Sequence, residues 1–192
     1  RATAAALADA GAHVEEVTLP WTMEFVWEAV QAHFRAIMGA GVGHVHDEHA
    51  DLLSDYTRAF AIELGQQGKG FYDGLEMEGE IWRPVGELFR SFDVLLCPTM
   101  ATEGYLAGEP YLHGMDIGHE RVFHHLLGAM TVPFNVLSRC PVMSVPSGLA
   151  ANGVPTGVQV VARPYDDLMA FRVAGAIEMV RPMPACPGAQ AP

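Results

Sequence analysis

The sequence predicts an α/β fold in which a mixed, largely buried sheet is flanked by helices. Three observations support this class. The run Phe92–Thr99 is apolar throughout, which is typical of a strand covered on both faces, as in a parallel sheet. Two further strand-like runs, 142–145 and 156–162, lie close together near the carboxyl end. Elsewhere, apolar residues recur every three or four positions, as they do on one face of a helix.

The composition suits one domain with a substantial core. Of the 192 residues, 50% are hydrophobic and 18% are charged, against roughly 25% charged in an ordinary soluble domain. We expect residues 1–180 to form one domain and the proline-rich tail 181–192 to be flexible. We also expect part of the apolar surface to be covered by a missing amino-terminal segment or by a second copy of the chain.

The first predicted elements are a short helix and a strand. Residues 2–10 are rich in alanine and predict a helix that stops at Gly11. Residues 12–19 resemble a strand that Pro20 closes. A helix followed by a strand indicates that the chain starts within an α/β repeat.

Helices are predicted over most of residues 21–92. The first contains Phe25, Val30 and Ile37 at helical spacing and is broken by glycines at positions 39, 41 and 43. A second helix is expected at 47–64 and a third at 73–92, where Pro84 predicts a kink or a joint.

The buried strand at 92–99 leads into a long connection, 100–118, and connections of this length usually carry function or cover something. We expect a helix at 119–130, strands at 142–145 and 156–162, and a closing helix at 165–180. Asn152 and Gly153 between the two strands predict a tight turn close to the hairpin type.

Charge and cysteine content exclude several classes of function. The formal net charge is -12 and Lys69 is the only lysine, so neither nucleic acid nor an anionic membrane surface is an expected partner. No apolar run approaches the roughly 18 residues that a membrane span needs. The three cysteines include no C-x-x-C pair, which argues against a zinc knuckle or a redox pair and favours a reducing, cytoplasmic setting.

The sequence contains no complete catalytic group. None of its five serines lies in a G-x-S-x-G or S-x-x-K motif. Ser147 lies in an elbow-like Pro-Ser-Gly, but its neighbours indicate a strand end and a turn. His44, His46 and His49 could form a weak metal site, although a solvated helix start explains them better. We therefore predict no catalytic residue, no metal site and no cofactor.

A block near the carboxyl end carries a family resemblance. The positions that carry it are Asn135, Pro141, Ser144, Pro146, Gly148, Gly153, Pro155, Gly157, Gln159 and Glu178. Their order is similar to the carboxy-terminal end of the amidase signature family, and the runs 92–99 and 6–20 resemble the family's upstream strand and its mid-chain helix and strand.

The resemblance implies an amide hydrolase whose Ser-Ser-Lys triad lies nearer the amino terminus than anything in this chain. The context of Lys69 does not resemble that of the catalytic lysine, so we expect this chain alone to be inactive. It would supply strands and one wall of the pocket for a small-molecule amide. The expected wall residues follow the strand at 92–99 or belong to the segment 134–141: Thr99, Phe134, Asn135, Arg139 and Cys140.

Two other functions remain open at this stage. The scaffold could serve as a non-catalytic binding or assembly module. Alternatively, the three clustered histidines at 44–49 could bind zinc.

Overall fold

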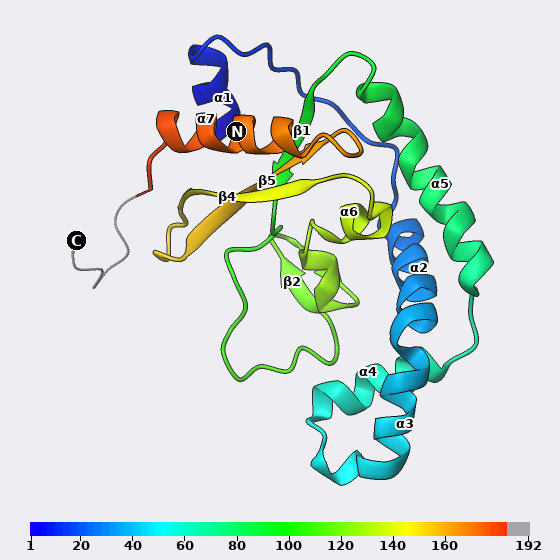
Figure 1. The fold of residues 1–192 in the computed structure, drawn as a ribbon. Coiled ribbons are helices and arrows are strands. Elements are labelled where there is room, and N and C mark those ends of the chain that lie inside the picture. The colour runs from blue at the N-terminus through cyan, green and yellow to red at the C-terminus, as the bar shows by residue number, and fades with distance from the viewer. Residues whose placement is uncertain (184–192) are drawn as a thin grey trace.

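The computed structural model describes residues 1–183. Helices surround a small antiparallel sheet in this part of the chain (Figure 1). The predicted tail, 181–192, lies outside the described residues from position 184 onward. The α-helices are α1 (Ala2–Asp9), α2 (Met23–Phe34), α3 (Ala40–His49), α4 (Asp55–Gly65), α5 (Phe71–Leu88), α6 (Val132–Leu137) and α7 (Asp167–Val180). The strands are β1 (Val94–Pro98), β2 (Met115–Ile117), β3 (Glu120–Val122), β4 (Val142–Leu149) and β5 (Pro155–Ala162).

The main sheet has the order β1-β5-β4, and both of its strand pairs are antiparallel. The strand predicted at 92–99 is present as β1, and its one neighbour within residues 1–183 is antiparallel. An apolar run shows that a strand is covered, but it does not reveal the direction of its neighbour. The predicted turn between β4 and β5 is confirmed: Gly153 has a φ of 81°, and the N–H of Ala150 donates to the carbonyl of Val154 at 2.9 Å.

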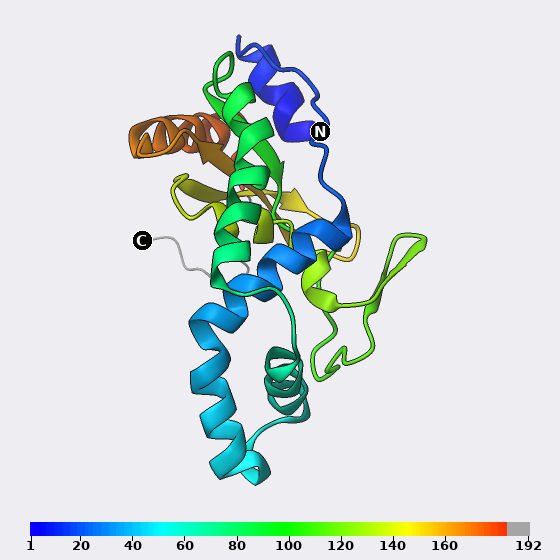
Figure 2. The same ribbon diagram turned by 90° about the vertical axis from the view of Figure 1, so that its right-hand side faces the viewer.

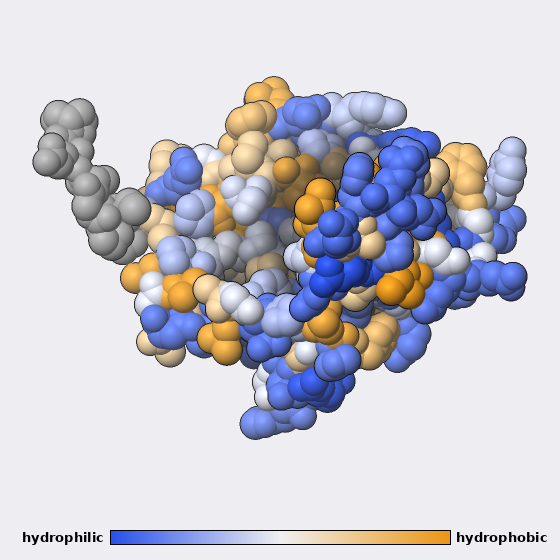
Figure 3. All heavy atoms as spheres, turned by 90° about the horizontal axis from the view of Figure 1, so that it is seen from below, coloured by the Kyte–Doolittle hydropathy of each residue, from blue (hydrophilic) through white to orange (hydrophobic). Residues whose placement is uncertain are grey.

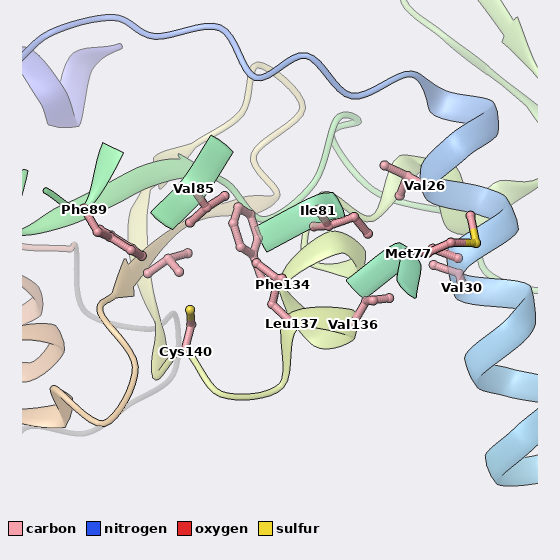
Figure 4. Packing of buried hydrophobic residues seen from close by; sticks show 12 residues of the cluster. Val26, Val30, Met77, Ile81, Val85, Phe89, Phe134, Val136, Leu137 and Cys140 are labelled. Carbon is pink, nitrogen blue, oxygen red and sulfur yellow. The ribbon is translucent and has the colours of Figure 1, made fainter. Parts of the chain in front are cut away.

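Helices pack on the two faces of this sheet. Val145, Val158 and Val160 point to one face and pack against α1 and α7, where Leu7 and Ile177 contribute to the same cluster. The opposite face meets α2, α5 and α6 in a second cluster, shown in Figure 4. The fully buried members of this second cluster are Ala29, Ile81, Val85 and Val161.

One arginine links the sheet to α5. Arg163 follows β5, and its guanidinium donates to the carbonyls of Phe89 and Phe92, each at 3.0 Å. A planar guanidinium can satisfy both carbonyls at once. Arg163 therefore fixes the connection between α5 and β1.

The segment from α2 to α4 forms a helical arm that extends away from the sheet (Figures 1 and 2). The predicted break at Gly39, Gly41 and Gly43 is wrong, because a π turn (Arg35–Gly39) runs directly into α3. A glycine costs about 1 kcal/mol in a helix, which weakens the helix without ending it. The break lies instead before α4, where the Ser54 hydroxyl accepts the N–H of Thr57 and caps the helix.

Two further predictions fail for identifiable reasons. Residues 12–19 are extended and largely exposed but form no strand, because no neighbouring strand within residues 1–183 offers them a ladder. The helix expected at 119–130 is replaced by the β2–β3 hairpin and a 3₁₀ turn, His125–Gly128. Gly118 has a φ of 61° at the hairpin turn, and Arg121 pairs with Asp116 across the hairpin at 3.1 Å.

The third predicted helix is confirmed as α5, with Pro84 inside it. The closing helix is confirmed as α7. None of the helices in residues 1–183 is long and apolar enough to cross a membrane.

Candidate functional site

The main sheet carries a row of polar side chains across its three strands. Gln159 on β5 lies opposite Cys97 on one side and Ser144 on the other. Directly opposite residues in a sheet share a face, so these three side chains lie on the face that also meets α2, α5 and α6. Helices do not cover the whole of this face, since Ser144 and its neighbour Pro146 are exposed.

Gln159 is the anchor of this row. Its side chain is fully buried, and its Nε2 donates to the carbonyls of Pro98 and Met130, each at 2.9 Å. These carbonyls belong to the two ends of the long connection between β1 and α6. Gln159 Oε1 is buried and has no hydrogen-bond partner among the described residues. One buried amide thus ties the base of the connection to the central strand.

Thr99 continues β1 beside Gly157. Its N–H donates to the Gly157 carbonyl at 3.1 Å, and its carbonyl accepts the N–H of Met130 at 3.0 Å. A Cβ at position 157 would lie 2.8 Å from Thr99 Oγ1. The glycine is therefore required by the close approach of the threonine. Thr99, Gly157 and Ser144 form a small polar surface on the open part of the sheet.

The cysteine in the row is not suited to nucleophilic chemistry. Burial raises the pKa of Cys97 to about 12, and the hydrogen bond with Gln159 only partly offsets that rise. The thiolate is the reactive form of cysteine. Cys97 therefore serves packing and not catalysis near neutral pH.

The other predicted site residues lie around α6. Phe134 is buried in the core cluster, with its ring 5.9 Å from that of Trp21. Asn135 is exposed, and its N–H donates to the Thr131 carbonyl. Because Thr131 follows Met130, which is bonded to Thr99, the segment that carries Asn135 begins beside Thr99. Cys140 is buried, and burial raises the pKa of its thiol.

Arg139 lies in a different groove. Its Nη1 donates to Oε1 of Glu78 at 2.6 Å, and the Glu78 carboxylate is almost buried. The groove has a volume of about 510 Å³ and is also lined by Leu75, Trp82 and Pro164. Pro141, which closely follows Arg139 in the chain, pairs with Ala162 at one end of β5: its carbonyl accepts the N–H of Ala162 at 3.0 Å. Thr99 pairs instead with Gly157, nearer the other end of the same strand. Five residues of β5 separate these points, or about 17 Å of strand, so Thr99 and Arg139 do not share one site.

Sequence reasoning included Gly157 and Gln159 in a family pattern but did not assign them to the site. A signal was present, because Gln159 interrupts an otherwise apolar strand and a buried polar side chain needs partners. Its partners could not be deduced, since they lie on segments distant along the chain.

The histidines at 44–49 lie on α3. His44 is 3.5 Å from Glu48 and His46 is 3.6 Å from Asp47. Within residues 1–183 no group of three or more His, Cys, Asp and Glu side chains is arranged to hold a metal ion. The metal-binding alternative therefore gains no support from the described residues.

Seen from below, the molecule is recessed near the centre of its face, and both apolar and polar residues lie in and around the recess (Figure 3). Several large apolar side chains are exposed on the sheet and on the connections around it, including Val142, Leu149 and Leu106. Exposed apolar patches commonly mark binding surfaces.

Comparison with known proteins places the chain in a family. A family model described as Amidase matches residues 1–171. A glutamyl-tRNA(Gln) amidotransferase subunit of Granulibacter bethesdensis is 31% identical over 199 residues, which cover 91% of this chain and 38% of that relative. An acylamidase of Rhodococcus erythropolis is 25% identical, with 93% of this chain and 37% of the relative covered. The chain thus spans less than two fifths of these relatives.

Solved structures show the same fold. A crystal structure of an amidase superposes with a TM-score of 0.77 at 23% identity, over 92% of this chain and 39% of that one. A bacterial aryl acylamidase of the amidase signature family gives a TM-score of 0.75 at 21% identity, over 94% of this chain and 39% of that one. The predicted α/β class is confirmed by this likeness. Together with the family match over most of its length, it shows that the chain belongs to the amidase signature family.

Proposed function

We propose that this chain is the carboxy-terminal part of an amide hydrolase that acts through an acyl-enzyme. A nucleophilic serine outside this sequence would attack the amide carbonyl carbon, the C–N bond would break, and the amine would leave with a proton. Water would then cleave the acyl ester. Membership of the amidase signature family supports this reaction class, as does coverage of less than two fifths of each compared relative.

The surroundings of the serines support a nucleophile from elsewhere. Ser147, in the elbow-like setting, shares a hydrogen bond of 2.9 Å with Thr156 Oγ1, and Thr156 also bonds the Gly148 carbonyl. Ser54 caps α4. A serine nucleophile needs a base within hydrogen-bond reach, and neither of these hydroxyls has one among the described residues.

The observation that carries the proposal is the open part of the sheet. Thr99, Ser144 and Gly157 face it, and the buried Gln159 on the same face bonds the carbonyls of Pro98 and Met130, which lie next to Thr99. This surface would form one wall of the acyl pocket, with Asn135 on the neighbouring segment. Phe134 and Cys140 would support the wall from within the core, while Arg139, in the separate groove beside Glu78, would lie outside it.

The uncovered apolar surface would be buried against a missing amino-terminal segment or a second copy of the chain. The compared amidotransferase subunits suggest that larger assemblies exist in the family. No observation favours the alternative of a non-catalytic binding or assembly module. A cytoplasmic location stays a prediction from cysteine content.

The proposal is tested by comparing this chain with the longer protein that its gene would encode. The gene is sequenced upstream of the codon for Arg1, and the chain is assayed with a chromogenic anilide, alone and as part of the longer product. We expect an in-frame segment with a catalytic lysine and a Gly/Ser-rich region, and hydrolysis by the longer protein only. A longer protein that carries this segment, folds and hydrolyses no amide in a broad panel would contradict the proposal.

A further inference from the structure

The connection between β1 and α6, residues 100–131, is fixed to the sheet only at its base. There, the N–H of Ala101 donates to the Gly128 carbonyl at 2.8 Å, and Met130 bonds Thr99. Beyond this base lie the β2–β3 hairpin and exposed chain that includes Leu106. Two aromatic contacts join the connection to the helical arm: Phe123 lies against Trp27 and His125 against Tyr56, with ring centroids 5.9 and 5.2 Å apart.

A polar contact with the helical arm adds to these aromatic contacts. Glu63 on α4 accepts a hydrogen bond from Gln31 Nε2 on α2 at 2.7 Å. The other carboxylate oxygen of Glu63 lies 3.5 Å from Nε2 of His124, which belongs to the connection. The His124 side chain is 16% exposed and that of Glu63 is 29% exposed. Three segments that are far apart in the sequence therefore meet at one carboxylate.

The orientation of His124 is set from two sides. The N–H of Leu126 donates to His124 Nδ1 at 3.2 Å, so Nδ1 carries no hydrogen. The neutral ring must then carry its hydrogen on Nε2, which faces Glu63. The imidazole also lies against the Trp27 indole of α2, with a centroid distance of 4.1 Å. The ring can thus donate to Glu63 without rearrangement.

Titratable groups from the connection and from α4 face this contact. Burial lowers the pKa of His125, with His124 adding to the shift and Glu63 opposing it. On α4, burial and then Glu63 raise the pKa of Tyr56. On the connection, burial raises the pKa of Tyr105, followed by the effects of Tyr111 and Tyr56. Gln31 and Trp27 on α2 are neutral.

We propose that Glu63 and His124 are positioning residues that hold the connection 100–131 against the helical arm. The contact fixes the connection where it passes the arm, just before the 3₁₀ turn His125–Gly128, so that the chain leading away from Thr99 forms a rigid wall. That this wall limits the size of the amide substrate rests on the proposed function. The attachment itself does not depend on any reaction.

Two substitutions of His124 separate its hydrogen bond with Leu126 from its contact with Glu63. His124→Asn keeps a short side-chain acceptor for the N–H of Leu126 but is too short to reach Glu63. His124→Gln reaches toward Glu63 with an amide N–H but no longer presents the acceptor in the same place. If His124 served only the local turn, the connection would exchange its amide hydrogens faster in His124→Gln than in His124→Asn. If His124 attaches the connection to the arm, exchange is faster in His124→Asn.

Hydrogen exchange followed by mass spectrometry measures the result on the 192-residue chain itself. We expect peptides from 115–131 to exchange roughly tenfold faster in His124→Asn than in the wild type, because the contact with the Glu63 carboxylate is lost. In His124→Gln they should exchange at close to the wild-type rate. Peptides from β5 serve as the internal reference for global unfolding. A nitrogen NMR spectrum should also show His124 Nδ1 without hydrogen in the wild type.

Glu63→Ala should reproduce the faster exchange, with Glu76→Ala as the matched control. Glu76 is an exposed carboxylate on α5 with no ion pair within residues 1–183. Equal exchange in the two His124 variants overturns the proposal, whether or not the Glu63 variant folds. Faster exchange in His124→Asn alone supports it. Since no hydrolysis is measured, failure of the proposed amidase function would leave this result unaffected.

Discussion

Replacing Gln159 by methionine tests the anchor of the candidate wall. Methionine has nearly the same length and volume, so packing changes little. The substitution removes both hydrogen bonds to the carbonyls of Pro98 and Met130. An unsatisfied buried polar group costs about 1–3 kcal/mol. Part of that loss is recovered, because the buried Oε1 of Gln159, which has no partner among the described residues, also disappears.

We therefore expect Gln159→Met to lower the free energy of unfolding by about 2–3 kcal/mol. In a chain of this size that corresponds to a fall of roughly 4–12 °C in the melting temperature. Urea unfolding followed by circular dichroism measures the free energy directly. Ser144→Ala, on the exposed neighbour in the same row, is the control and should change stability by less than about 0.5 kcal/mol.

Two results would contradict this interpretation of Gln159 and Ser144. If Gln159→Met were as stable as the wild type, the two carbonyls would have other partners and Gln159 would not anchor the connection. If Ser144→Ala were equally destabilising, the exposed part of the sheet would contribute to the fold and would not be available as a pocket wall.

Three further predictions concern the close packing, the link to α5 and the effect of pH. Gly157→Ala should destabilise the chain by about 1–3 kcal/mol through the clash with Thr99, and a Thr99→Ala background measured in a double-mutant cycle should remove most of this cost. Arg163→Lys should lower the free energy of unfolding in urea by about 1–2 kcal/mol, because an ammonium group cannot reproduce the paired bonds to two carbonyls. Stability equal to the wild type would show that Arg163 does not fix the connection between α5 and β1. Burial lowers the pKa of His125 in the folded chain. As the pH falls below about 6.5, the unfolded chain therefore binds a proton before the folded chain does, and the free energy of unfolding decreases. A His125→Asn variant should lose less of this free energy over the same pH range, and parallel curves of stability against pH for the two proteins would contradict this.

The predictable part of the fold came from strong local signals. The strands β4 and β5 and the turn at Gly153 were predictable because β-branched residues flank an Asn-Gly pair. The helices α5 and α7 followed from apolar periodicity. Residues 12–19 have the same local strand character but no partner strand within residues 1–183. A strand depends on its neighbour, which local sequence does not specify.

The helical arm and the connection failed for a related reason. Glycines at 39–43 weaken a helix locally, yet the hydrogen-bond pattern continues through them as a π turn. At 119–130 the apolar residues have helical spacing, but the turn at Gly118 starts a hairpin whose pairing fixes the backbone. In both places the backbone hydrogen bonds, within the helix or across the hairpin, decided the structure against the local residue pattern.

The site was predictable only as far as a family pattern placed it. Thr99 bonds Met130, which precedes the segment that carries Asn135, and their sharing of one pocket wall stays a prediction. The contribution of Gln159 depends on carbonyls 61 and 29 residues away along the chain. Which residues meet across such long separations is decided by the packing of the sheet and not by local sequence.

The central claim is that this chain supplies a pocket wall to an amide hydrolase whose nucleophile lies elsewhere. The most direct measurement is anilide hydrolysis by the purified 192-residue chain and by the longer product that includes the upstream segment. The account predicts no hydrolysis above background for the chain alone and clear hydrolysis for the longer product. Hydrolysis by the chain alone that survives alanine substitution of each of its five serines would contradict it.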